Sequence, residues 1–550
     1  MRNHMAAGWF YSPRQIVRYF ATRLTSLQPP RNKLRNPIAI LRELTTHQWL
    51  MFAAGFLAWT WDAFDFFTVS MTVTELAAQF NVAYSDVSWT CYHPQRIEAY
   101  TEILSGHDSH SDASVRRRPR LWHNLRSLWQ EVPNDHQPGA FCVLELASGF
   151  CNTLPQFLGV RSLYGIAMGG LFGPAAATAL EDLPYEARGL LSGVFQEGYA
   201  VGYLLAAAFY RALVPTTSHG WRSLFWFGAG PPILIIAFRL WLPETNHFQV
   251  MKAEREARIR AQQDQQQQQQ DGADLRATGF RAFVKESSKA LRANWVLLIY
   301  MVVLMTGFIS CSHGSQDFDP TFLKDQVGMG PTDTTVVTVV GQIGAFLGGA
   351  TVGYTSSFFG RRLSMICACI VGGALIPAYV LPRNMSLVAS AFFEQFFVGG
   401  AWGPIPIHLV ELSPNVLRSL TVGLTYQLGN LASSASATIQ SVIAERFPLP
   451  PAPNGTKKFD YGRVIAIFMG AVWAYMLFFL LLGPEMSQEE RQEQAEAALY
   501  LERLRLEGVS LTQIGEKRAA NSSSGEEQTP ESKNADGKKD EEDIAVEHVE

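Results

Sequence analysis

A short polar stretch is the first place in this sequence where residue types and their spacing can do chemistry. It runs from Ser310 to Thr321 and directly follows the apolar run from Trp295 to Phe308. A histidine, an amide and a carboxylate are costly to bury at the end of a membrane-spanning helix, so they mark an ion or substrate path more often than a lipid-facing surface. His313 and Asp317 lie four residues apart and are a candidate proton-accepting pair, because histidine exchanges protons near neutral pH and a carboxylate one turn away tunes that exchange.

The same stretch offers contacts for a polar substrate. The Gln316 amide can hydrogen-bond a carboxylate or a hydroxyl group, and the Ser315 hydroxyl stands beside it. In an alternative reading, His313 only caps the helix end by binding its last carbonyl groups. A lone histidine rarely holds a metal ion, so neither a metal nor a cofactor is predicted.

A second polar pair, Gln427 and Asn430, lies in an apolar run near the end of the chain. Residues three apart share one face of a helix, so the two amides are expected to point the same way. They are candidate substrate contacts. Polar groups in membrane helices also join neighbouring helices by hydrogen bonds, and that alternative stays open.

Acidic residues inside apolar runs form a third group of candidates. Asp62 and Asp65 share a helix face, and an acid in the middle of a span costs roughly 2.5–3.5 kcal/mol on insertion scales. They either belong to the transport path or are satisfied structural acids. The weaker intramembrane candidates are Gln196, Glu197, Tyr199, Glu394 and Gln395.

The elements that must position these residues are membrane-spanning helices. Of the 550 residues 47% are apolar and only 17% charged, and the charges are concentrated in a few segments, which indicates an all-α polytopic membrane protein. No nucleophile–base pair or metal arrangement predicts an enzyme, and nothing indicates a nucleic-acid partner. The predicted spans cover residues 49–73, 140–158, 161–180, 190–213, 222–242, 294–312, 334–356, 363–381, 386–409, 419–443 and 462–483.

The predicted organisation has two membrane halves with soluble segments around them. Lys and Arg cluster in the N-terminal region and in the linker, so the positive-inside rule places both in the cytosol, which five spans in the first half cannot satisfy. The gap lies at residues 91–138, where a span is missing or misread. The segments are a cytosolic N-terminal region (1–48), a first half (49–243), a cytosolic linker with the run Gln265–Gln270 (244–293), a second half (294–483) and a disordered acidic cytosolic tail that regulators can bind (484–550).

An internal repeat supports two equivalent halves. Glu181, Pro184 and Arg188 recur as Glu411, Pro414 and Arg418, because 411−181, 414−184 and 418−188 all equal 230. Two homologous six-helix halves are typical of the major facilitator architecture, with a site near the midplane between them. These charged groups suit cytosolic loops that latch helix ends better than substrate contacts.

A second loop pattern has its glycines and arginines at Gly353, Gly360, Arg361 and Arg362. The glycines permit close backbone approach, and the arginines suit a cytosolic helix end. The pattern resembles the G-x-x-x-D-x-x-G-R-R loop of major facilitator transporters, with Ser357 at the acidic position. The repeat places its first-half partner near residue 123.

The polar stretch itself carries a more specific resemblance. Ser312-His313-Gly314-Ser315-Gln316-Asp317 with Thr321 resembles N-x-x-[ST]-H-x-[ST]-Q-D-x-x-x-T, the signature of the fungal Jen-type monocarboxylate:proton symporters, with Ile309 in place of the asparagine. The Q-x-x-N pair is similar to a substrate-binding pair of the same family. The resemblance implies uptake of lactate, pyruvate or related carboxylates with a proton across the plasma membrane, and some members prefer dicarboxylates such as malate and succinate.

The missing span has an explanation in the reading frame. Trp122 with His123, and Trp129 with Gln130, each force a glycine when the frame is shifted by one base, and the next two codons encode only Lys or Arg. The shifted frame therefore contains the glycine and arginine spacing of the second loop pattern at the place where the repeat expects it. We expect residues 91–138 to be misread, by a frame shift or a retained intron. As written, the chain then lacks a lining helix and an arginine that the Jen-type family uses to bind the carboxylate, so a non-transporting copy or a nutrient sensor remains the alternative function.

Overall fold

The structure is a computed structural model that describes most of both membrane halves. The described residues are 21–22, 27, 35–82, 137–168, 171–246, 249–250, 252–254, 256–257, 260, 294–316, 318–319, 322–413, 418–450, 458–485, 509–510, 512–514 and 516. The chain divides into two compact units, residues 1–243 with 286–492, and residues 244–285 with 493–550. The first unit contains every labelled helix and the site.

The first half begins with a short helix and continues with long apolar ones. Thr45 and Gln48 form a capping box at the start of α3, which fixes where this first span begins. The helices are α2 (Pro37–Arg42), α3 (Thr46–Met71), α4 (Val73–Phe80), α8 (Gln137–Ser148), α9 (Leu154–Met168), α10 (Phe172–Leu180), α11 (Tyr185–Gln196), α12 (Gly198–Leu213), α13 (Arg222–Gly228) and α14 (Pro231–Trp241).

The second half has the same character. Its elements are α17 (Trp295–Gln316), the π-helix η5 (Phe322–Val327), α19 (Pro331–Phe359), α20 (Arg361–Val380), α21 (Leu387–Trp402), α22 (Ile405–Leu412), α23 (Arg418–Ser433), α24 (Ser436–Glu445), the antiparallel strands β1 (Pro448–Leu449) and β2 (Lys458–Phe459), and α25 (Tyr461–Leu482). Among the described residues, five continuous helices are long and apolar enough to cross a membrane: Arg222–Trp241, Trp295–Gln316, Thr332–Phe359, Arg361–Val380 and Tyr461–Leu482.

Each predicted span contains at least one described helix, which confirms the all-α prediction. Several spans are two helices joined at a break. The break falls at Glu197 between α11 and α12, and at Gly403 and Pro404 between α21 and α22. Broken helices are common where a membrane protein lines a site, because the freed backbone groups face a cavity instead of lipid.

One predicted boundary is wrong. The spans 140–158 and 161–180 placed a turn near residue 160, whereas α8 ends at Ser148 and α9 begins at Leu154. The Asn152 N–H donates to Gln156 Oε1 at 3.2 Å, so polar residues start the new helix early. The apolar residues around the turn hid it from a hydropathy reading.

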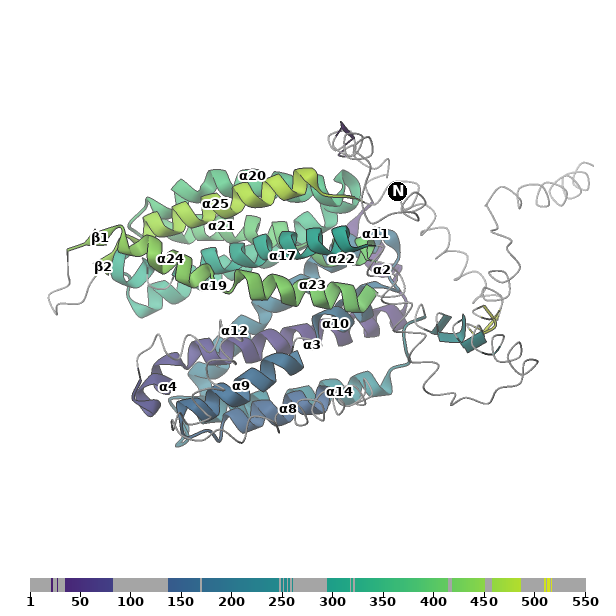
Figure 1. Ribbon diagram of the computed structural model, residues 1–550, viewed down its shortest axis with the longest axis horizontal. Coiled ribbons are helices and arrows are strands. Elements are labelled where there is room, and N and C mark those ends of the chain that lie inside the picture. Colours follow the sequence, from purple (N-terminus) through teal and green to yellow (C-terminus); the bar gives the residue numbers. More distant parts are fainter. Residues whose placement is uncertain are drawn as a thin grey trace, which may run out of the picture. The chain divides into compact units, whose positions relative to one another are not determined.

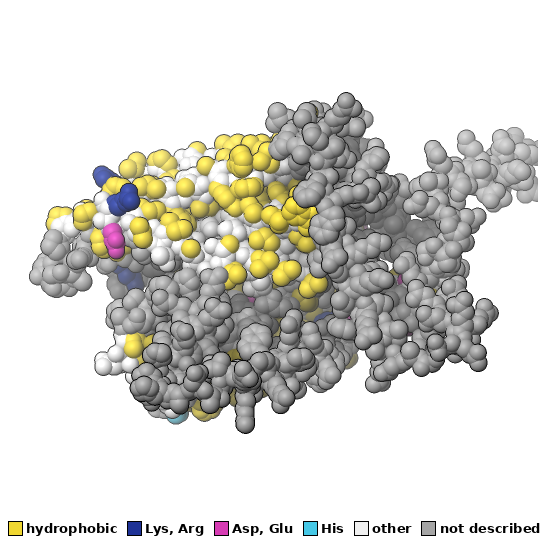
Figure 2. Space-filling view, viewed as in Figure 1, with side chains coloured by type: hydrophobic (Ala, Val, Ile, Leu, Met, Phe, Trp, Pro, Cys, Tyr) yellow, Lys and Arg dark blue, Asp and Glu magenta, His cyan; other side chains and the backbone are white. Residues whose placement is uncertain are grey.

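The two halves lie side by side as roughly parallel bundles, with α3, α8, α9 and α14 in one and α17, α20, α23 and α25 in the other (Figure 1). We call the end that holds α2, the start of α17 and Gly360 the linker end, and the end that holds α4, η5 and the two strands the far end. Large apolar side chains cover the visible flank of the second half between these ends (Figure 2). Exposed apolar residues of the second half include Ile299, Ile370 and Phe478, as expected of a lipid-facing surface.

The halves meet most closely where α11 crosses α19. A Cβ atom on Gly193 would collide with the backbone carbonyl of Gly349, and one on Gly353 would lie 2.6 Å from the Gly189 carbonyl oxygen. Only glycine permits this backbone-to-backbone approach, a packing mode that membrane helices use often. The crossing closes the unit toward the linker end.

Candidate functional site

A large cavity lies between the two halves. Its volume is about 2240 Å³, and helices of both halves contribute to its walls. It reaches the exposed residues Gln79, Pro215 and Lys324 at the far end. Toward the linker end it stops at aromatic residues that include Trp59 and Tyr426.

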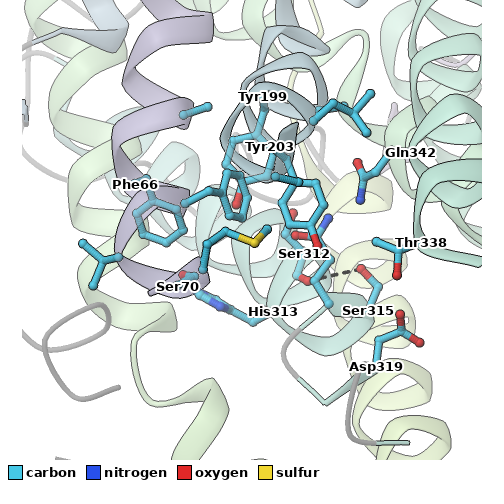
Figure 3. Close-up of a pocket in the computed structure, with 18 of the residues that line it drawn as sticks. Phe66, Ser70, Tyr199, Tyr203, Ser312, His313, Ser315, Asp319, Thr338 and Gln342 are labelled. Atoms are coloured by element: carbon cyan, nitrogen blue, oxygen red, sulfur yellow. Dashed lines mark hydrogen bonds between the residues drawn. The ribbon is translucent and has the colours of Figure 1, made fainter. Parts of the chain in front are cut away.

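The last turn of α17 presents the predicted polar stretch to this cavity. Trp402 Nε1 donates to Ser312 Oγ at 3.0 Å, and Ser315 Oγ donates to the Ser312 carbonyl oxygen at 3.1 Å. Gln440 Nε2 donates to the His313 carbonyl oxygen at 3.5 Å. These bonds fix the turn, while the His313 side chain lies along the cavity wall (Figure 3). Its position in the last helical turn is also compatible with the capping alternative.

Most of the predicted site residues come together. Those that line the cavity are Asp62, Glu197, His313, Ser315, Gln316, Glu394, Gln427 and Asn430. Asp317 lies outside the described residues. Asp65 does not line the cavity and instead lies behind Asp62 in the first half. The Asn430 side chain also hydrogen-bonds Tyr426, so the interhelical role remains open for this residue.

The second-half wall contains groups that the sequence reading did not single out. Tyr379 donates its hydroxyl hydrogen to Asp319 Oδ1, and Thr338 of α19 lies next to that acid, with Gln342 one helical turn further along (Figure 3). On the same wall, the sequence candidate Glu394 accepts a hydrogen bond at Oε2 from Nε2 of Gln395, also a sequence candidate, at 2.8 Å. Asp319 follows Asp317 by two residues. The sequence therefore shows an acid at this position, but it does not show that its side chain lines the cavity.

The first half holds a buried cluster of acids around one arginine. Arg161 Nη1 forms an ion pair with Glu145 Oε2 at 2.5 Å, and Arg161 Nη2 donates to the Asp65 carbonyl oxygen at 3.4 Å. The guanidinium carbon lies 4.0 Å from the centre of the Tyr164 ring, a cation–π contact. Glu145 and Asp65 are fully buried, and Asp62 is 2% exposed.

Several carboxylate oxygens in this cluster have no hydrogen-bond donor among the described residues. Tyr164 interacts with Asp65, but no well-formed hydrogen bond from a described residue reaches either carboxylate oxygen of Asp65, or Oδ1 of Asp62. Among the described residues, three carboxyl groups therefore interact with one guanidinium group. Ionised carboxylates are very costly to bury without compensation, so this cluster depends on the positive charge of Arg161.

Aromatic rings form the floor of the cavity and join the halves. Tyr426 of the second half stacks on Phe172 of the first, with ring centres 4.2 Å apart, and Trp59 packs edge-on against Tyr426 at 5.7 Å. Aromatic pairs of this kind contribute about 0.5–1.5 kcal/mol beyond their burial. They separate the cavity from the linker end.

Ion pairs and hydrogen bonds at the linker end reinforce this closure. Arg418 Nη1 of the second half contacts Glu181 Oε1 of the first at 2.8 Å. Ser192 Oγ donates to the Gly403 carbonyl oxygen at 2.9 Å and accepts from the Ile407 N–H at 3.1 Å. Arg188 donates to the carbonyl oxygens of Leu183 and Glu181. The linker end is therefore held shut.

The loop between α19 and α20 is organised around Arg361. Its Nη1 atom donates to Ser356 Oγ at 2.7 Å and Ser357 Oγ at 3.1 Å, and its Nη2 atom contacts Glu411 Oε1 at 3.1 Å. Ser357, at the usual acidic position, thus still binds the guanidinium group. Arg362 instead donates to carbonyl oxygens at the end of α25.

Gly360 adopts a φ of 93°, which disfavours any residue with a side chain. The carboxylate of Glu485 accepts from the Arg361 N–H at 2.7 Å, so it stabilises the start of α20. Before the first span, Arg35 forms hydrogen bonds with Glu43 and Glu186. These bonds raise the pKa of Arg35, and the bond with Glu43 has the larger effect.

Comparison with known proteins identifies the fold and the family. Residues 140–497 match the family described as "Sugar (and other) transporter". The chain belongs to this transporter family. A carboxylic acid transporter protein homolog of Saccharomyces cerevisiae is 35% identical over 515 residues, which cover 92% of this chain and 80% of that protein. The resemblance to Jen-type transporters is confirmed, and because family members are transporters, so is the prediction that the chain is not an enzyme.

More distant relatives agree on the architecture. The cis,cis-muconate transport protein of Acinetobacter baylyi is 24% identical over 304 residues, which cover 54% of this chain and 68% of that protein. The proton:xylose symporter XylE, a solved member of the major facilitator superfamily, aligns with a TM-score of 0.52 and 16% identity over 80% of this chain and 97% of its own. This transporter is therefore a multi-pass membrane protein with the major facilitator fold, as predicted.

Proposed function

We propose that this transporter takes up short-chain carboxylates together with protons by alternating access. Lactate and pyruvate are the first candidates, with malate and succinate as the dicarboxylate alternative. The observation that carries the proposal is the cavity, which is closed at the linker end, reaches the far end and is lined by His313 and amide groups of both halves. The names of two relatives, a carboxylic acid transporter homolog and a muconate transport protein, support an organic acid as the substrate.

In this proposal the substrate carboxylate binds near the last turn of α17. Gln316 and Ser315 donate hydrogen bonds to it from one helix, and Gln427 and Asn430 donate from α23. His313 and Asp317 exchange the coupled proton. Proton binding near the anion reduces the charge that must cross the membrane, which favours joint movement of the two.

The buried acids of the first half are a second place for a coupled proton. Asp62, Asp65 and Glu145 are buried together, and like charges so close favour binding of a proton by one of them. Asp62 and Arg161 line the cavity and connect the cluster to it. A substrate anion close to Arg161 changes the balance of charge and so the protonation of its neighbours.

The proposed orientation follows from the distribution of basic residues. Lys and Arg are concentrated before α3 and in the linker, so the linker end is cytosolic, both termini are cytosolic and the cavity faces outward. We place the transporter in the plasma membrane. The linker and the acidic tail are then available to cytosolic regulators.

Uptake measurements test the proposal. Cells that lack their own carboxylate transporters would express the full chain, and uptake of labelled lactate would be compared at pH 5 and pH 7, with and without a protonophore. We expect faster uptake at pH 5 and its loss with the protonophore. Equal uptake at both pH values and in the presence of the protonophore would contradict proton coupling.

The alternative is a chain that binds carboxylates without transporting them, as a sensor or a defective copy. The observation that favours it is the absence of an apolar run of span length at residues 91–138. Binding of lactate to the purified chain, together with no uptake by cells that display it on their surface, would support this reading.

A further inference from the structure

The second-half wall of the cavity carries two acids, Asp319 and Glu394, that form no ion pair with any described residue. Glu394 of α21 is 5% exposed, Asp319 follows the end of α17, and the two are close enough to interact electrostatically. Both line the cavity through which a substrate from the far end must pass.

Several described residues on this wall are neutral polar groups. Gln395 is 7% exposed, its Oε1 atom has no hydrogen-bond donor among the described residues, and Thr334 Oγ1 is likewise unpartnered. Gln342, also buried, completes the wall from α19 (Figure 3). Amide and hydroxyl groups bind neutral polar substituents well but do not neutralise an anion.

Charge decides what this wall accepts. Two nearby carboxyl groups do not both ionise easily, but a pair with one ionised member still carries a negative charge. A second carboxylate on the substrate would bring a like charge next to it in a site with little water. Repulsion between like charges that no cation neutralises distinguishes strongly between a ligand with a second carboxylate and one without it.

We infer that Asp319 and Glu394 form a selectivity wall that rejects a second carboxylate, so that the transporter prefers monocarboxylates whose other polar group is a hydroxyl or an amide. The inference rests on the proposed carboxylate function and narrows it. The opposite side, with Phe66 and Tyr199 of the first half, receives the apolar part of the substrate (Figure 3).

Binding of succinate and succinamate tests the inference. The two acids have the same length, but succinate is a dianion at pH 7.5 and succinamate carries an amide in place of the second carboxylate. Titration of the purified full chain would follow intrinsic tryptophan fluorescence, since Trp59 and Trp402 line the cavity. We expect the wild-type chain to bind succinamate at least about tenfold more tightly than succinate.

Variants that keep the shape of each side chain but remove its charge show whether these two acids cause the preference for succinamate over succinate. In the double variant Glu394→Gln and Asp319→Asn we expect the affinity for succinate to rise. The affinities for succinamate and succinate should then differ by no more than about threefold. Asp333→Asn, which removes an exposed acid from the first turn of α19, is the matched control and should leave the ratio unchanged. A gain of binding cannot result from misfolding.

The possible outcomes distinguish failure of the selectivity wall from failure of carboxylate binding as a whole. Equal binding of both ligands by the wild-type chain, or an unchanged ratio in the double variant, would overturn the selectivity wall while leaving carboxylate transport intact. Binding of neither ligand by the wild-type chain would overturn the carboxylate function and the wall together.

Discussion

His313 is the residue on which the proposed coupling depends most. In a transport-competent form of this chain, we expect His313→Ala and Asp317→Ala each to abolish proton-coupled uptake, because the pair provides the exchangeable proton beside the substrate. Uptake of labelled lactate between pH 5 and pH 7 and surface labelling of the variants are the measurements. Wild-type rates and pH dependence in both variants, with normal surface expression, would refute this role.

Glu145 and Arg161 lead to a prediction about stability. Arg161→Met leaves three buried carboxyl groups without their cation, and removing one partner of a buried ion pair typically costs about 3–5 kcal/mol. The double variant Arg161→Met with Glu145→Gln removes both charges, so it should be less destabilised than Arg161→Met alone.

Thermal unfolding of the purified variants in detergent measures this difference. We expect the midpoint of the double variant to lie between those of the wild-type chain and Arg161→Met. A double variant that unfolds at the same temperature as Arg161→Met, or below it, would show that the ion pair does not dominate the cluster.

At the scale of elements, the crossing of α11 and α19 is the tightest contact between the halves. Gly193→Ala would place a methyl group against the Gly349 carbonyl, and overpacking of this kind typically costs about 1–3 kcal/mol. We expect the variant to loosen the linker end as well as to lower stability.

Gly470→Ala is the matched control for the crossing, because no described atom lies within 4 Å of the new Cβ position. Limited proteolysis and thermal unfolding of the two variants would be compared with the wild-type chain. Equal behaviour of Gly193→Ala and Gly470→Ala would mean that the close approach is not required.

The 230-residue repeat relates whole elements but not all of their contacts. Glu411 pairs with Arg361 of its own half, whereas its counterpart Glu181 pairs with Arg418 of the other half. The first-half position equivalent to Arg361 falls at residue 131, outside the described residues. The symmetry of the sequence therefore predicts where these acids lie but not which arginine each one meets.

At the scale of the whole molecule, the prediction concerns residues 91–138. We expect the transcript to encode a span and a glycine–arginine loop here in a shifted frame, and we expect the chain as written to misfold or fail to transport. A helix position that is not filled leaves polar faces of neighbouring helices without partners in lipid. Sequencing of the mRNA, combined with uptake assays, decides the matter.

The mRNA sequence and the uptake assay must be interpreted together. An mRNA that encodes Cys91 to Pro138 in frame, with robust carboxylate uptake by its product, would refute the prediction. A transcript with the shifted frame would restore the sixth span of the first half and the topology that the basic residues require.

The sequence by itself determined the features that are local along the chain. A membrane span is an apolar run of about 20 residues, so eleven spans could be read without knowledge of their neighbours. The repeat located the loops of the two halves, and the His313 motif identified the family. The turn before α9 was misplaced because apolar residues surround it.

Only the tertiary structure decided which side chains meet. The contact between Glu145 and Arg161 joins different helices, and that between Glu181 and Arg418 spans 237 residues and both halves. Asp319 and Glu394 likewise come to one wall from the segment after α17 and from α21. The rotation of each helix about its own axis, and the place where it crosses its neighbours, determine which side chains meet. An apolar run does not specify this rotation, because lipid accepts almost any apolar face.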